Sequence, residues 1–187
     1  MTPEALYRHL DYADKSRENR KKAAGFMLRH PELMPDLLRL CYRFDDPLSC
    51  KACMTLEFIC KQQLHRLLPF LDEFIANLSR FTFDAAVRPA AHIARMLTVA
   101  YFGKNPSPVK DRLTETHRKQ LAGVYFDWLM SNRKVAVKAY AIYSLYELGK
   151  EQSWIYPELK TILEQNMHRH SAAYKAAARN TLTKLRL

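Results

Sequence analysis

Four cysteines fall within a short stretch of the chain, at Cys41, Cys50, Cys53 and Cys60. The Cys50-x-x-Cys53 spacing could hold zinc or an iron–sulfur cluster, because thiolates are soft metal ligands. However, Cys53 lies in a helical pattern at a position that another segment of similar pattern fills with Ala90, so the competing interpretation is a small residue in a helix core. We expect structural thiols, unpaired in a reducing compartment, with no metal and no cofactor.

Other catalytic patterns are weak. His168 and His170 stand two apart at an expected helix junction, where they cannot share a helix face, so we expect a solvated turn and not a metal site. The four glycines of the chain form no phosphate-cradling loop. No nucleophile, histidine and acid stand out as a set, and no catalytic residue is predicted.

The charge of the chain is strongly one-sided. Lys and Arg number 30 against 19 Asp and Glu, which gives a net charge of +11 and a pI near 9.6. This balance favours an acidic partner, namely nucleic acid or an acidic protein. No run approaches the ~20 apolar residues that span a bilayer, and Met1-Thr2-Pro3-Glu4 does not begin a secretory leader. We expect a soluble, cytoplasmic protein with no membrane partner.

The elements that must position these residues are expected to be helices throughout. Leu and Ala are abundant, Gly is scarce, and no period-two strand pattern occurs, so the fold class is all-α. The segment 103–112 contains Pro106 and Pro108 and is expected to be a loop without regular helix. The expected helices cover residues 3–12, 15–30, 31–44, 47–63, 65–80, 84–102, 113–131, 134–148, 153–168 and 170–186.

Several residues are typical of helix ends. Asp84 is expected to cap one helix, and Ser131 or Asn132 another. Gly103 is expected to end the helix before it in the left-handed conformation, and Gly149 to end the helix over 134–148.

A helix pair recurs along the chain. Its first helix begins with a proline between apolar residues, at Pro35, Pro69 and Pro157. Its second helix carries a basic residue near the start, and these are Lys21, Lys51, Arg88, Lys138 and Lys175. Three positions later come Ala24, Met54, Ala91, Ala141 and Ala178, and four positions after those Leu28, Phe58, Arg95, Leu145 and Leu182. Only Arg95 breaks the apolar column, where Leu97 can take over the packing.

This pattern resembles the HEAT-repeat and armadillo-type family over roughly residues 15–185. The resemblance rests on the Leu-x-Pro-x-Leu first helices and the Val-Arg/Lys-x-x-Ala second helices, although the segment around Leu121 lacks the proline. It implies one domain over 1–187, a right-handed α-α superhelix of four to five antiparallel helix pairs with a loop insertion near 103–112.

The resemblance also implies a role for the basic column. In such solenoids the second helices line one face, which we expect to be the concave one. A basic ladder for an anionic partner would then be formed by Lys21, Lys51, Arg88, Lys138 and Lys175. In HEAT-like repeats the same residue also braces neighbouring repeats, and this alternative stays open. The last residues, 165–187, carry basic side chains and no acid.

The sequence therefore favours a non-catalytic scaffold for nucleic acid or an acidic protein, with Trp128 and Trp154 among the aromatics that could stack on bases. Two alternatives remain. One is a HEAT-like DNA glycosylase of the alkylation-repair type, to which Asp127-Trp128 and Arg133 bear a faint similarity. The other is a protein–protein adaptor with no nucleic-acid role.

Overall fold

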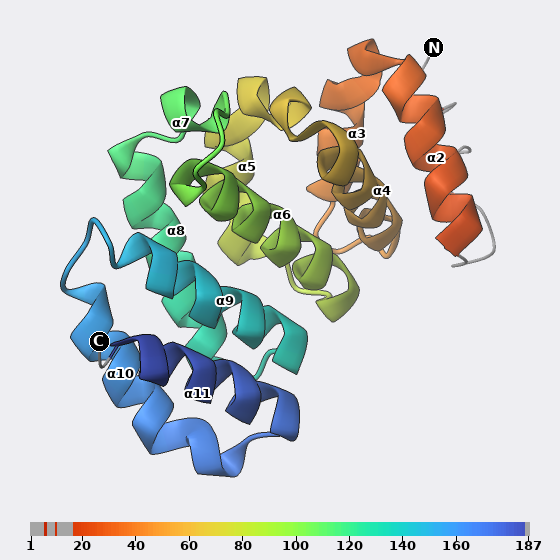
Figure 1. The fold of residues 1–187 in the computed structure, drawn as a ribbon. Coiled ribbons are helices and arrows are strands. Elements are labelled where there is room, and N and C mark those ends of the chain that lie inside the picture. The colour runs from red at the N-terminus through yellow and green to blue at the C-terminus, as the bar shows by residue number, and fades with distance from the viewer. Residues whose placement is uncertain (1–5, 7–9, 11–16, 186–187) are drawn as a thin grey trace. The chain divides into compact units, whose positions relative to one another are not determined.

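The computed structural model describes residues 6, 10 and 17–185, and over these the chain is helical without a strand. The all-α prediction is thus confirmed for this part (Figure 1), whereas the predicted helix over 3–12 lies almost wholly outside it. The α-helices are α2 (Arg17–Arg29), α3 (Met34–Cys41), α4 (Leu48–Gln63), α5 (Leu71–Asn77), α6 (Asp84–Phe102), α7 (Val109–Arg112), α8 (Glu115–Met130), α9 (Val135–Leu148), α10 (Ile155–Asn166) and α11 (Ala172–Leu185). Short 3-10 helices are η1 (Pro31–Leu33), η2 (Leu64–Phe70), η3 (Leu78–Arg80) and η4 (Met167–Arg169).

The chain divides into two compact units, Met1–Ile93 and Ala94–Leu187. The boundary falls inside α6, so this helix contributes its first part to one unit and its last part to the other. The expectation of one repeat domain over 1–187 stays a prediction.

In the first unit, α4 packs against α2 and α3. Its buried side includes Ala52, Cys53 and Leu56, which meet the apolar sides of its neighbours. Cys53 therefore occupies the core position that its spacing predicted. All four cysteines are free of disulfides, three of them are buried, and Cys50 is partly exposed. Burial raises the pKa of the Cys53 and Cys60 thiols, as expected for thiols in apolar surroundings.

A charged contact is enclosed in the same unit. The carboxylate of Glu57 on α4 is only 5% exposed and lies 2.6 Å from Nδ1 of His92 and 2.8 Å from Nζ of Lys61. Burial raises the pKa of Glu57, but the hydrogen bonds with His92 and Lys61 outweigh it and leave that pKa below its ordinary value. The contact between Glu57 and His92 therefore links α4 to the first part of α6.

In the second unit, α9 is the central helix, in contact with α8, α10 and α11 (Figure 1). Its buried side consists of Val137, Ala141, Leu145 and neighbours, and Ala141 is fully buried. A small residue at this position lets the adjacent helices approach closely. The small-residue column is confirmed as core at Ala24, Ala91, Ala141 and Ala178, but not at Met54, which is partly exposed because α4 turns Cys53 inward instead.

Two expectations about helix ends are wrong. None of the four glycines has a positive φ, so Gly103 does not adopt the left-handed conformation. A Cβ at position 103 would lie 2.9 Å from the carbonyl oxygen of Val99. Glycine therefore fits here because the backbone of α6 comes too close for a side chain. The N-cap of α9 is Lys134, while the hydroxyl of Ser131 donates to the Trp128 carbonyl at the end of α8.

The loop at 103–112 contains one helical turn, α7, which the sequence reading excluded. Pro108 precedes this turn and does not interrupt it, so no amide donor is lost inside the helix. The Ser107 hydroxyl accepts a hydrogen bond from the Val109 amide and starts the turn. The predicted helix over 65–80 is likewise broken, since Pro69 lies in the tighter helix η2 before α5 begins.

Within the part of the chain that the structure covers, no helix is both long enough and apolar enough to cross a membrane.

Candidate nucleic-acid interface

Three tyrosines stand along the outer side of α9. Tyr140, Tyr143 and Tyr146 follow one another at intervals of three, which places them along one side of a helix. All three are partly exposed, whereas the opposite side of α9 is buried. The sequence puts phenol rings here because the core side of α9 is already filled by smaller apolar residues.

Cations from three different segments reach these rings. The Arg95 guanidinium of α6 lies 5.8 Å from the ring centroids of both Tyr140 and Tyr143. The ammonium groups of Lys184 and Lys150 lie 5.3 and 5.8 Å from the Tyr146 ring. These are cation–π distances. We call the six residues Tyr140, Tyr143, Tyr146, Arg95, Lys150 and Lys184 the tyrosine face.

Two of these cations differ in their polar partners. Lys150 forms an ion pair with Glu147 at 2.5 Å, and the hydrogen bond with Glu147 raises the pKa of Lys150. The Arg95 Nε is buried and has no hydrogen-bond partner among the described residues. Arg95 therefore keeps its charge with an unsatisfied donor beside two aromatic rings.

Lys138 on α9 is also short of acceptors. Lys138 is only 7% exposed as a whole residue, and no acidic side chain among the described residues pairs with it. Burial lowers the pKa of Lys138. Burial and then the charge of Lys138 lower the pKa of His170, whose ring lies 4.1 Å from that of Tyr174. Lys138 thus lies near His170, just before α11, and no carboxylate of the described residues pairs with this lysine.

The other predicted ladder residues are placed on separate helices. Lys175 is partly exposed on α11, which contacts α9. The first unit holds Lys21, exposed on α2, Lys51, partly exposed on α4, and Arg88, exposed on the first part of α6. The structure brings Lys138 and Lys175 onto adjacent helices, and the ladder through all five residues stays a prediction.

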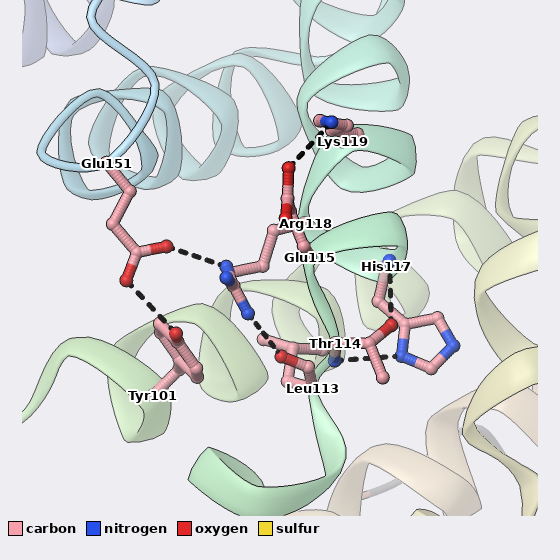
Figure 2. Close-up of polar contacts among 8 residues, drawn as sticks. All are labelled: Tyr101, Leu113, Thr114, Glu115, His117, Arg118, Lys119 and Glu151. Atoms are coloured by element: carbon pink, nitrogen blue, oxygen red, sulfur yellow. Dashed lines mark hydrogen bonds and ion pairs between the residues drawn. The ribbon is translucent and has the colours of Figure 1, made fainter.

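Arg118 joins three segments of the second unit (Figure 2). Its Nε lies 2.8 Å from the Glu151 carboxylate, just beyond the end of α9, and its Nη1 donates to the Leu113 carbonyl at 2.6 Å. The Tyr101 hydroxyl donates to the same carboxylate at 3.0 Å, and the guanidinium lies 4.4 Å from the Tyr101 ring. The end of α6, the start of α8 and the loop after α9 are therefore joined through one side chain.

The neighbouring His117 has a structural task. The Thr114 hydroxyl accepts a hydrogen bond from the His117 amide, and His117 Nδ1 accepts one from the Thr114 amide, both at 3.3 Å (Figure 2). This is a capping box in which histidine takes the place that Glu or Gln usually fills.

The two tryptophans have different roles. Trp128 is 3% exposed and packs edge-on against Tyr125, so its ring cannot stack on a base. This removes Trp128 from the stacking residues that the sequence suggested and weakens the likeness of Asp127-Trp128 to a glycosylase site. Trp154 is 51% exposed and stacks on Phe126.

Sequence reasoning missed Arg95 as a functional residue. The signal was its break in an otherwise apolar column, next to Leu97, which is fully buried. No set of three or more His, Cys, Asp or Glu side chains in the described residues is placed to hold a metal ion. The site is therefore aromatic and cationic in character.

No protein-family model matches the chain, and neither the curated proteins nor the solved structures provide a match. The functional argument accordingly rests on the chain's own geometry and charge.

Proposed function

We propose that this protein is a non-catalytic helical-repeat scaffold that binds nucleic acid, with the tyrosine face as part of its contact surface. The observation that carries the proposal is the Arg95 guanidinium beside the Tyr140 and Tyr143 rings. Aromatic side chains next to cations are the combination that single-stranded nucleic acid requires, since rings stack on bases and cations neutralise phosphates.

The electrostatics of α9 support an anionic ligand. Lys138 is 7% exposed as a residue and pairs with no carboxylate among the described residues, and burial makes its charged form costly. A phosphate oxygen near this side chain would offset that cost. The same contact would favour the protonated form of His170, whose pKa the Lys138 charge now lowers.

Nucleic acid is favoured over an acidic protein by the rings. An acidic peptide would use the cations of the tyrosine face but would gain little from three tyrosines in a row. A base gains about 1–3 kcal/mol from each aromatic ring on which it stacks. The alternative of a protein–protein adaptor with no nucleic-acid role accounts for neither the row of tyrosines nor the cations beside it.

The arrangement as a HEAT-like superhelix belongs to this proposal. In it, the concave face would carry Lys21, Lys51, Arg88, Lys138 and Lys175 as a ladder that follows the phosphate backbone. Supporting it are the recurrent helix pairs and the exposure of Lys21 and Arg88.

The test is fluorescence anisotropy with a labelled single-stranded oligonucleotide at several salt concentrations. Each phosphate contact on a single strand contributes about −0.7 to the slope of log K against log salt. We expect Lys184→Gln to reduce the slope by about one such contact and Tyr143→Ala to weaken binding about tenfold with the slope unchanged. Lys119→Gln is the matched control, because Lys119 is an exposed lysine paired with Glu115 on α8.

The variant Lys138→Gln distinguishes two roles for Lys138: a contact with the ligand, and a contact that holds neighbouring helices together. If Lys138 is a phosphate contact, the change lowers the salt slope and leaves the melting temperature the same or higher, because it removes a partly desolvated charge. A lower melting temperature with unchanged binding would make Lys138 a brace between helices. Tighter, ring-independent binding of a polyglutamate peptide would reject nucleic acid as the partner.

A further inference from the structure

A second surface of the unit Ala94–Leu187 carries an acidic side chain beside its aromatic rings. A shallow hollow of about 290 Å³ is lined by Phe126 of α8, Trp154 just before α10, and Glu158 in the first turn of α10. It is built from the first helices of the pairs, whereas the tyrosine face is built from α6, α9 and α11. Its chemistry is therefore separate from that of the proposed nucleic-acid contact.

The rings of the hollow are arranged as a platform. Phe126 and Trp154 are stacked, with centroids 5.6 Å apart and planes inclined by 29°. Phe126 supports the indole from one side, and Trp154 remains 51% exposed, so a large aromatic surface faces solvent. Tryptophan is enriched at binding hot spots, and here its exposed ring lies in a hollow beside an acidic side chain.

The carboxylate determines what the platform can bind. Glu158 is exposed, and no cation in the described part of the chain pairs with it. In a chain with 30 Lys and Arg against 19 Asp and Glu, this is an acid left unpaired beside an indole. Its negative charge opposes a phosphate and attracts a cation, so the hollow does not suit a nucleotide.

We propose that the hollow of Phe126, Trp154 and Glu158 binds an arginine side chain of a partner protein. A planar guanidinium can lie flat on the exposed indole, where the cation–π attraction is strongest for tryptophan. In that position its N–H groups can donate in pairs to the Glu158 carboxylate. The inference goes beyond nucleic-acid binding and shares no residue with the tyrosine face.

The intrinsic fluorescence of the protein provides the assay. Trp128 is buried, so a solute that reaches only the surface changes the emission of Trp154. The probes are acetyl-Gly-Arg-Gly-amide, its citrulline counterpart, which has the same shape without the charge, and its lysine counterpart. We expect saturable binding of the arginine peptide, about tenfold weaker binding of the citrulline peptide, and intermediate binding of the lysine peptide.

Variants locate the contact. Glu158→Gln should weaken the arginine peptide about tenfold, and Trp154→Ala, followed by calorimetry, should abolish measurable binding. Glu164→Gln is the matched control, because Glu164 is an exposed acid on the same helix outside the hollow, and it should bind as the unmodified protein does. Both changed residues are exposed, so circular dichroism should remain unchanged.

Three results would overturn the assignment. Equal affinity for the arginine and citrulline peptides would show that charge is not recognised. Unchanged affinity in Glu158→Gln would remove the carboxylate from the contact. Binding of adenosine monophosphate that depends on Trp154 would make the hollow a base-stacking site. None of these outcomes affects the oligonucleotide measurements on the tyrosine face.

Discussion

Glu57 shows how a single charge is kept inside the first unit. Removing a carboxylate from water costs several kcal/mol unless hydrogen bonds or cations compensate, and here His92 and Lys61 both lie within hydrogen-bond distance of the same oxygen. The bonds outweigh the burial, so the pKa of Glu57 in the folded protein is below the unperturbed 4.5. The protonation of Glu57 is therefore coupled to the stability of the folded protein.

The sign of that linkage gives a prediction. A depressed folded-state pKa contributes stability above the unfolded pKa of 4.5, and this contribution is lost as the pH falls through the lower, folded value. We expect Glu57→Gln to lower the free energy of unfolding by about 2 kcal/mol near neutral pH, with a smaller deficit in acid. Urea unfolding followed by circular dichroism at several pH values measures both effects.

Glu115→Gln is the control for that experiment, because Glu115 pairs with Lys119 on an exposed helix surface. Such a pair contributes little to stability. If the loss in free energy of unfolding in Glu57→Gln is the same at neutral and at acid pH, the coupling between the protonation of Glu57 and folding is contradicted.

At the scale of the element, α9 depends on one small residue. Ala141 is fully buried on the side of α9 that faces the neighbouring helices. We expect Ala141→Asp to destabilise the protein by about 3 kcal/mol or more, because the site cannot hydrate or pair a carboxylate. Ala139→Asp, on the partly exposed side of the same helix, should cost about 1 kcal/mol or less. Similar melting temperatures for the two variants would show that the side of α9 assigned to the core is wrong.

The helices were largely predictable because local patterns determine them. The end of α4 at Gln63 and the span of α6 follow from apolar periodicity and from Asp84. Gly149 was correctly placed at the end of α9, but its reason is not local: a Cβ there would collide with the ring of Tyr156, which stacks on Tyr146. The tyrosine face was not predictable, since Arg95 meets its rings across a distance in sequence that no periodic pattern encodes.

At the scale of the whole molecule, the excess of positive charge is not spread evenly: the tyrosine face is rich in cations, whereas the hollow of Phe126, Trp154 and Glu158 carries an acid. The net charge of +11 indicated an anionic partner but not where it binds. The second unit combines a cation-rich side with rings and an acid-bearing hollow with rings. The two partners that we propose, a nucleic acid and an arginine-bearing protein, would therefore be bound by separate chemistry on separate surfaces, and composition alone could not suggest this.

The contacts of Arg118 also carry a consequence for kinetics. Its partners lie far apart in sequence, and the Tyr101–Glu151 bond alone spans 50 residues. Contacts of this sequence separation must first overcome the entropy of loop closure, so we expect them to form after α8 and α9 have packed and to be absent from the folding transition state. Arg118→Met should therefore speed unfolding about tenfold while the refolding rate changes little, and stopped-flow measurements across denaturant concentrations would show one limb displaced. A slower refolding limb would place the cluster in the nucleus, and the lifetime of the native state would then not depend on this residue.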